Sequence, residues 1–318
     1  MGKLILNEWT KLFRRIGTWV MFGIVILMVI GMGTYLKYDE SNHPPQENLN
    51  WKQDLTVQLE NDRTSLEEVG QNNANLRTFY ERQIAIKEYQ IENELSPETG
   101  QNVWSFIGEA MGAIGFIGVF TIIIAAGIVS NEFSWGTVKL LLIRPMKRTK
   151  ILLAKYLTVL LFGISMLSAT FLIAAVIGFA LFGLPEQAIP HLAYVDGQVV
   201  ERSLFMQLIG EYLLGSIDVL MLATMAFMIS AVFRNSSLAI GLSLFLMFMG
   251  GTVTMIVASK YEWAKYILFA NTDLSVYFDG VPLLDGMTLG FSIFILFLYF
   301  ALFQFLAFFV FAKRDVTA

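Results

Sequence analysis

Hydrophobic residues in the chain gather in six long runs that are separated by polar segments. The runs cover about residues 17–36, 106–129, 153–183, 205–232, 237–258 and 287–311. A helix needs about 20 mostly apolar residues to cross the hydrocarbon layer of a bilayer, and each run meets that length. The pattern predicts an all-α integral membrane protein with six transmembrane helices. No small-residue cleavage site precedes Lys37, so the first run is expected to remain as an anchor.

The residues before the first run have the pattern of an amphipathic helix. Between residues 3 and 16, apolar and aromatic side chains share one side of a helix, and charged and polar side chains share the other. Such a helix lies in the plane of the membrane interface, with its apolar side in the bilayer. The residues expected to anchor it at the inner surface are Glu8, Trp9, Lys11, Arg14 and Arg15.

Residues 37–104 form the largest polar segment and are rich in helix-forming residues. Apolar residues recur in two helical stretches, and residues 70–73 have the composition of a turn between them. This predicts an extracellular helical hairpin, followed by a five-span core over 105–318, with 1–36 holding the interfacial helix and the first span. Two roles stay open for the hairpin, namely a stalk or cap, and a gate or substrate-recognising lid.

The segment 259–285 is too polar to span a membrane and unusually aromatic for a free loop. Its rings are of the amphipathic kind found at bilayer interfaces. We therefore expect short helices that dip back into the outer leaflet. The aromatic residues are Trp263, Tyr266, Phe269, Tyr277 and Phe278.

Composition supports the membrane assignment. The chain is 56% hydrophobic and 15% charged, whereas soluble domains average about 45–50% apolar and 25% charged residues. It has no cysteine, which excludes disulfides, thiolate chemistry and cysteine metal sites. The two histidines, His43 and His191, lie far apart in polar connections and have no metal-binding spacing.

The positive charges set the expected orientation. With the N-terminus inside, the short internal segments hold most of the 22 Lys and Arg residues, and their acids are only Glu8, Glu132 and Asp315. The excess of cations on cytoplasmic segments predicts that both termini are cytoplasmic. The cations in question are Lys3, Lys11, Arg14, Arg15, Lys139, Arg144, Lys147, Arg148, Lys150, Lys155, Arg234, Lys313 and Arg314.

Motifs for common chemistry are missing from the sequence. It contains no phosphate-binding G-x-x-x-x-G-K-[ST], no H-E-x-x-H, no G-x-S-x-G and no EF-hand pattern. The candidate pathway acids inside the spans are Glu109, Glu211 and Asp218, all toward predicted outer ends. Glu211 and Asp218 share one helical face, so they either line a water-filled vestibule or sit at headgroup level. We expect neither a catalytic site nor a cofactor in this chain, so energy for active transport must come from elsewhere.

One basic amphipathic segment, residues 131–150, lies between the second and third runs. Its apolar residues recur at helical spacing until Pro145 interrupts them, and Arg144, Lys147, Arg148 and Lys150 follow. From the residues alone, three interpretations compete. The segment is a linker that fixes topology, a contact for anionic lipid, or a docking helix for a partner.

The order of residues in this segment resembles the intracellular loop of ATP-binding-cassette permeases of the second exporter class. That family's pattern has an acid, Gly-Thr, Leu-Leu, Pro, a basic residue and then Gly-Lys. The matching residues are Glu132, Gly136, Thr137, Leu141, Leu142, Pro145 and Lys155, with Ala154 where glycine is usual. The opening NEWTKLFRR, the six spans and the dipping segment before the last span extend the resemblance to nearly the whole chain outside 37–104.

The resemblance implies a bacterial exporter subunit in the cell membrane. Residues 131–146 would form a cytoplasmic coupling helix that docks on a separate ATPase, which binds ATP and Mg²⁺, while a second permease copy or paralogue completes the exporter. The docking residues would be the matched residues together with Phe133, and Glu132 would pair with a partner cation or cap the helix start. Lipid is an expected partner and nucleic acid is not.

Two other classes of function stay open at the level of sequence. The chain could be a standalone ion-coupled carrier, which needs a functional acid at mid-depth of the membrane. It could instead be a membrane receptor or scaffold that uses the external hairpin. The substrates that the family resemblance implies are amphiphilic, lipid, peptide or antibiotic-like molecules.

Overall fold

A computed structural model describes the chain over residues 1–44, 48–69, 73–97, 100–135, 147–185, 190–195, 197–233 and 235–313. The predicted coupling helix 131–146 lies mostly outside these ranges, and so do its residues Gly136, Thr137, Leu141, Leu142 and Pro145.

Within the described ranges, six helical spans are long and apolar enough to cross a membrane, as the hydrophobic runs predict. The second span is composite, because a short 3₁₀ stretch, η1 (Ala110–Ala113), separates α5 (Val103–Glu109) from α6 (Ile114–Ser134). The other spans are α2 (Ile16–Asn42), α8 (Arg148–Leu181), α9 (Leu204–Phe233), α10 (Ser236–Ala258) and α11 (Leu289–Lys313).

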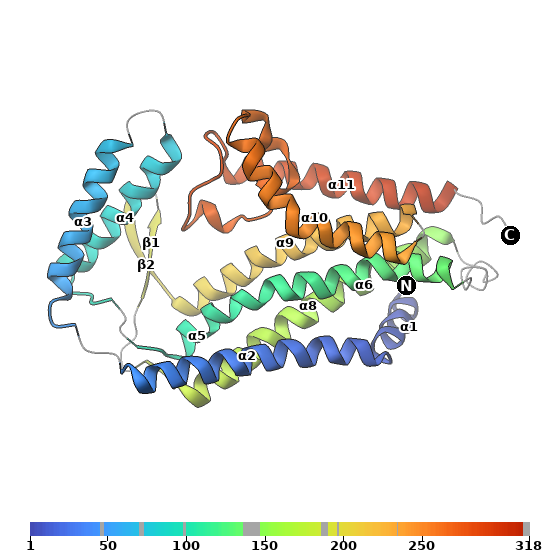
Figure 1. Cartoon of the computed structure of the whole chain (residues 1–318), viewed down its shortest axis with the longest axis horizontal. Coiled ribbons are helices and arrows are strands. Elements are labelled where there is room, and N and C mark those ends of the chain that lie inside the picture. The colour runs from blue at the N-terminus through green and yellow to red at the C-terminus, as the bar shows by residue number, and fades with distance from the viewer. Residues whose placement is uncertain are drawn as a thin grey trace.

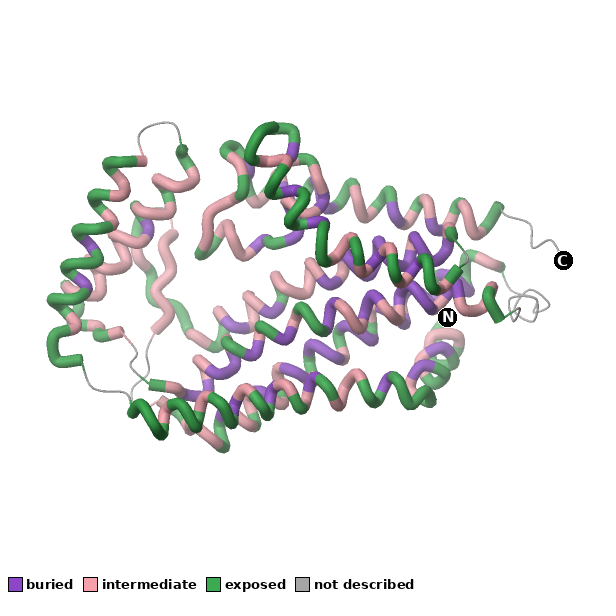
Figure 2. The backbone as a smooth tube through the Cα atoms, in the orientation of Figure 1, coloured by how far each residue is buried: buried purple, intermediate pink, exposed green. Residues whose placement is uncertain are grey.

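The centre of the bundle is the pair α6 and α9 (Figure 1). Small residues along both helices, among them Ala125, Ala126, Ala223 and Ala226, are fully buried and let the two backbones approach closely. In their most apolar windows, α9 is 61% buried and α10 only 17% buried. Figure 2 shows the same division, with buried positions concentrated on the inner helices and exposed ones along α2 and α11. The outer helices therefore carry the apolar surface that faces lipid.

The two ends of the bundle differ (Figure 1). The N-terminal helix α1 (Gly2–Phe13) lies at one end, together with the end of α6, the start of α8 and the end of α11. At the opposite end, α3 (Trp51–Glu68) and α4 (Ala74–Glu92) pack side by side. Ion pairs between Asp62 and Lys87 (2.5 Å) and between Arg63 and Glu88 (2.7 Å) join these two helices.

The chain is predominantly helical, as predicted, and a small β-hairpin that the sequence analysis did not predict is added to the helices. Strands β1 (His191–Val195) and β2 (Gln198–Arg202) pair antiparallel and pack against α4. Gly197 in the turn has φ +83°, a conformation that glycine adopts without strain. The sequence signal was available, because an Asp-Gly pair between two β-prone stretches typically marks a hairpin.

The segment between α10 and α11 forms three short 3₁₀ helices, η2 (Glu262–Tyr266), η3 (Leu268–Ala270) and η4 (Ser275–Tyr277). Its conformation is held by Asn271, which is fully buried. The Asn271 amide donates to the carbonyls of Lys265 and Ile267, and its oxygen accepts from Ser292 Oγ on α11 (2.6 Å). Asn271 therefore closes the segment on itself and fastens it to α11.

Gly250 on α10 provides a test of how closely this segment packs. A Cβ atom added at Gly250 would overlap the ring of Phe269, whereas one added at Gly251 would meet nothing within 4 Å. We expect Gly250→Ala to lower the free energy of unfolding by about 1–3 kcal/mol, the usual range for overpacking. Thermal unfolding of the purified protein measures this, with Gly251→Ala as the matched control. Equal stability of the two variants would contradict the close contact.

Candidate functional site

Helix α1 presents one acidic side chain to the protein interior. Glu8 is only 8% exposed and lies on the same side as the buried Leu12. This corrects the prediction that Glu8 belongs to the polar face, although Lys11 and Arg14 are exposed as expected. Glu8 is flanked at helical spacing by Leu4, Ile5 and Leu12, so a position inside the apolar face could have been recognised from the sequence.

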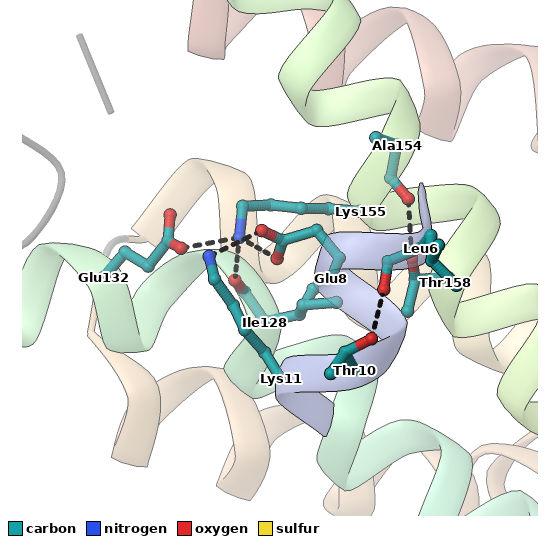
Figure 3. Close-up of polar contacts among 9 residues, drawn as sticks. All are labelled: Leu6, Glu8, Thr10, Lys11, Ile128, Glu132, Ala154, Lys155 and Thr158. Carbon is teal, nitrogen blue, oxygen red and sulfur yellow. Dashed lines mark hydrogen bonds and ion pairs between the residues drawn. The ribbon is translucent and has the colours of Figure 1, made fainter. Parts of the chain in front are cut away.

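The partner of Glu8 is Lys155 of α8, which is 1% exposed. Its ammonium donates to Glu8 Oε2 at 2.8 Å, to Glu132 Oε1 at 2.7 Å and to the Ile128 carbonyl at 3.3 Å. All three N–H bonds of the ammonium therefore have acceptors. Figure 3 shows that these acceptors come from α1 and from the last turns of α6, so one side chain joins three helices.

The charges in this cluster balance. Glu8 also accepts a hydrogen bond from Lys11 at 2.7 Å, so two carboxylates face two ammonium groups. A buried charge is tolerated only when it is paired and hydrogen-bonded. The Lys155 ammonium also lies near the C-terminal end of α6, where the helix dipole favours a cation. We refer to Glu8, Lys11, Glu132 and Lys155 as the inner ion cluster.

The pKa of Glu8 reflects these surroundings. Burial alone would raise the pKa of this carboxyl, but the charge of Lys155 and the hydrogen bonds from Lys11 and Lys155 outweigh it. The pKa of Glu8 therefore lies below its usual value of 4.5. Glu8 is ionised at neutral pH, and its ionised form stabilises the fold.

A cavity of about 230 Å³ adjoins the inner ion cluster. It lies between α1, α2, α6 and Ile240 of α10, and the cluster together with Arg15 and Asn131 forms its polar part. The α1–α2 turn is fixed beside it, since Thr18 Oγ1 donates to the Leu12 carbonyl (2.7 Å) and Trp19 Nε1 to the Phe13 carbonyl (2.8 Å).

Three further predicted anchor and docking residues that the structure describes, Trp9, Arg15 and Phe133, make aromatic or cation–π contacts. Trp9 stacks on Phe13 with ring centroids 4.3 Å apart, and the Arg15 guanidinium lies 5.7 Å from the centroid of Trp135. Phe133 contacts Phe311 of α11 with centroids 6.2 Å apart. The end of α6 is thus tied to α1 and to α11 as well as to α8.

Two expectations for the docking surface need correction. Glu132 does not begin a separate helix, because it lies in the last turn of α6 (Ile114–Ser134). Its carboxylate binds Lys155 of its own chain. Lys155 lies in the interior and presents no exposed surface to a partner. The docking roles of the residues outside the described ranges stay predictions.

The predicted vestibule acids lie on α9, toward the opposite end from the inner ion cluster. Glu211 accepts a hydrogen bond from Gln207 of the same helix at 3.1 Å, whereas Asp218 lies near Thr272 and Asp273. Their shared vestibule stays a prediction. Glu109 accepts from Gln101 at 2.9 Å. Within the described residues, no three His, Cys, Asp or Glu side chains lie close enough together to hold a metal ion.

Comparison with known proteins places the chain in one family. Residues 74–317 match the family described as "Protein of unknown function (DUF2705)". The chain is 46% identical over 318 residues to the "Uncharacterized protein YhcI" of Bacillus subtilis (strain 168), covering 99% of both chains. It is 31% identical over 224 residues to the "Uncharacterized membrane protein YdbK" of the same organism, which covers 70% of this chain and 87% of that protein.

Replacing Lys155 with methionine tests the inner ion cluster. The change leaves two partly buried carboxylates without their shared ammonium, and breaking a buried pair in this way costs about 3–5 kcal/mol. We expect Lys155→Met to lower thermal stability strongly at neutral pH. Lys150→Met is the matched control, because Lys150 lies on the exposed start of the same helix and its replacement should change little.

The pH dependence separates lost ion pairing from lost packing. A carboxyl with a lowered pKa in the folded state stabilises the protein fully above its unfolded pKa, and this stabilisation fades as the pH falls through the folded pKa. For Glu8 the loss therefore develops below about pH 4.5. The difference between wild type and Lys155→Met should shrink there, and an undiminished difference would contradict an ionic origin.

Proposed function

Because the chain belongs to the family described as "Protein of unknown function (DUF2705)", a description that states no activity, we propose a function from its site and its sequence resemblance. The chain is a multi-pass membrane protein with six apolar helices of membrane length. We propose that it is the transmembrane subunit of an ATP-driven exporter of the ATP-binding-cassette type. In this proposal it works with a separate ATPase and a second permease subunit.

The inner ion cluster is the observation that supports this proposal. The loop that would dock on the ATPase leaves from the end of α6 and returns to the start of α8. Glu132 and Lys155 lie on these two helices and bind each other, and Glu8 binds the same ammonium from α1. A displacement of the loop would therefore move α1, α6 and α8 together rather than bend one of them.

Motion would then reach the rest of the bundle through the central helix pair. Helix α6 packs along α9, and the backbone N–H of Ser130 donates to Ser230 Oγ of α9 at 3.0 Å. Rigid movement of packed helices is a common way in which a local event opens a distant site. ATP binding by the partner would tilt this helix group, and the far end of the bundle would open toward the outside.

The energy source in this proposal lies outside the chain. Its sequence holds no phosphate-binding loop, so ATP and Mg²⁺ would be bound by the partner. The substrate classes are those that the family resemblance implies, namely amphiphilic, lipid, peptide or antibiotic-like molecules. Both termini would be cytoplasmic, because cations of α1, of the start of α8 and of the end of α11 gather at one end of the bundle.

The orientation can be tested by cysteine labelling, because the chain has no native cysteine. Two matched positions are Asn61 on α3 and Thr149 at the start of α8, both exposed. We expect a membrane-impermeant maleimide to label Asn61→Cys on intact cells and Thr149→Cys only after permeabilisation. The reverse pattern would contradict the proposed orientation and with it the docking of a cytoplasmic ATPase at residues 136–146.

The ATPase partner can be tested by affinity purification of the tagged full-length chain from membranes. We expect a nucleotide-hydrolysing subunit to copurify, identified by mass spectrometry and by ATPase activity of the eluate. Replacing Leu141 and Leu142 with Glu would place charges in the apolar docking surface. The copurified activity should fall about tenfold or more.

The control for this purification is Val57→Glu, which adds the same charge at an exposed site on α3 and should leave copurification unchanged. Failure of any ATPase to copurify would contradict the proposal. Transport driven by an ion gradient in vesicles without ATPase would support the ion-coupled carrier instead.

A further inference from the structure

Arg82 on α4 is a buried cation that has no counter-charge among the residues the structure describes. The residue is 9% exposed, and its Nε and Nη1 atoms are buried with no hydrogen-bond acceptor among the described residues. The α3–α4 hairpin is otherwise a polar element rich in acids. A guanidinium stays charged at any pH a protein encounters, so it cannot escape burial by losing a proton.

The other cations of the hairpin are all paired, which sets Arg82 apart. Their partners lie on α3, on α4 itself or just beyond it. The pairs are Lys52 with Glu94 (2.7 Å), Arg63 with Glu88 (2.7 Å), Arg77 with Glu81 (3.7 Å) and Lys87 with Asp62 (2.5 Å). Acids are thus plentiful on the two helices, and none of the described ones lies against the buried nitrogens of Arg82.

Helical geometry shows which way Arg82 faces. Lys87 and Glu88 mark the side of α4 that faces α3. Asn75, Arg82 and Tyr89 are spaced by seven residues, so they share one stripe on the opposite side. Arg82 therefore lies on the face of α4 that is turned away from α3.

Contacts at both ends of this stripe lead to the rest of the molecule. The Asn75 amide donates to the Leu284 carbonyl at 2.8 Å, in the segment that precedes α11. Tyr89 OH donates to Glu201 Oε1 on β2 at 3.2 Å. Arg82 lies midway, about 10 Å along the axis from each contact, and the same helix packs against β1 and β2.

A buried guanidinium without acceptors is costly, on the order of several kcal/mol. An oxyanion would relieve that cost, because phosphate and carboxylate oxygens match the planar N–H groups of arginine in charge and spacing. We propose that Arg82 is an anion-binding residue that receives the phosphate or carboxylate group of a ligand between the α3–α4 hairpin and the β1–β2 hairpin.

This site lies at the end of the bundle opposite the inner ion cluster. If the proposed orientation holds, the ligand binds from the outside of the cell or from the outer leaflet. The anionic group then belongs either to a soluble molecule or to a lipid headgroup. Binding at Arg82 requires neither the ATPase nor transport, so the two proposals fail separately.

The test uses the full-length protein in an uncharged maltoside detergent at constant ionic strength, with chloride as the reference anion. Thermal unfolding is followed while sodium phosphate, sodium acetate or phosphatidylglycerol is added. Arg82→Gln removes the guanidinium, and Arg77→Gln is the matched control, because the Arg77 side chain on the same helix is 41% exposed.

We expect at least one of these anions to raise the unfolding temperature saturably in the wild type and in Arg77→Gln. The apparent affinity should fall about tenfold or more in Arg82→Gln, as expected for loss of charged hydrogen bonds. A response to phosphate or acetate assigns a soluble ligand, and a response to phosphatidylglycerol alone assigns a lipid headgroup.

The proposal is overturned if no anion stabilises the wild type, or if Arg82→Gln responds as the wild type does. In either case Arg82 is only a buried structural cation. Should Arg82→Gln fail to fold, Arg82→Lys keeps the charge and loses the planar fork. The proposal then requires its anion affinity to fall at least about threefold below that of Arg77→Lys, and equal affinities overturn it.

Discussion

A single ammonium group between two carboxylates holds together the end of the bundle where the chain begins. Lys155 is almost completely buried, and a buried charge is stable only while its partners stay in place. Helices α1, α6 and α8 each contribute one member of the trio Glu8, Glu132 and Lys155. Separation of any one helix would leave an uncompensated charge in a low-dielectric interior. Apolar packing between the same helices tolerates sliding, whereas the trio fixes their relative positions.

The bilayer imposes the second constraint, because it supplies no hydrophobic force between helices that are equally apolar. Close contact must then come from small residues and from buried hydrogen bonds. The bundle has both along α6 and α9, where alanines are fully buried and Ser130 bonds to Ser230. Tyr156 OH on α8 and Thr224 Oγ1 on α9 form a further link at 2.8 Å. The inner ion cluster is thus continuous with a rigid central pair of helices.

Sequence periodicity predicts the six spans well because each run exceeds the length that a bilayer requires, whatever the helices pack against. Periodicity does not predict which segments far apart in the sequence contact each other. Glu8 and Lys155 are 147 positions apart, and only the fold shows that they meet. Glu132 is a second example. As an acid it was predicted at the start of a helix, whereas the structure places it in the last turn of α6. The β1–β2 hairpin was missed for another reason: its local turn signal was outweighed by the helical character of the chain.

The two ends of the molecule differ in how a buried cation is paired. Lys155 meets acids that belong to its own chain, and the result is a fixed junction of helices. Arg82 lies on a helix that carries several acids, but it has no described acceptor on its buried Nε and Nη1 atoms. A charge that is paired within the chain holds its neighbouring helices in place. In our proposal, the pairing of Arg82 is completed only when an external anion binds. The same electrostatic constraint therefore fastens one end of the bundle and, in our proposal, makes the other end responsive to an anion.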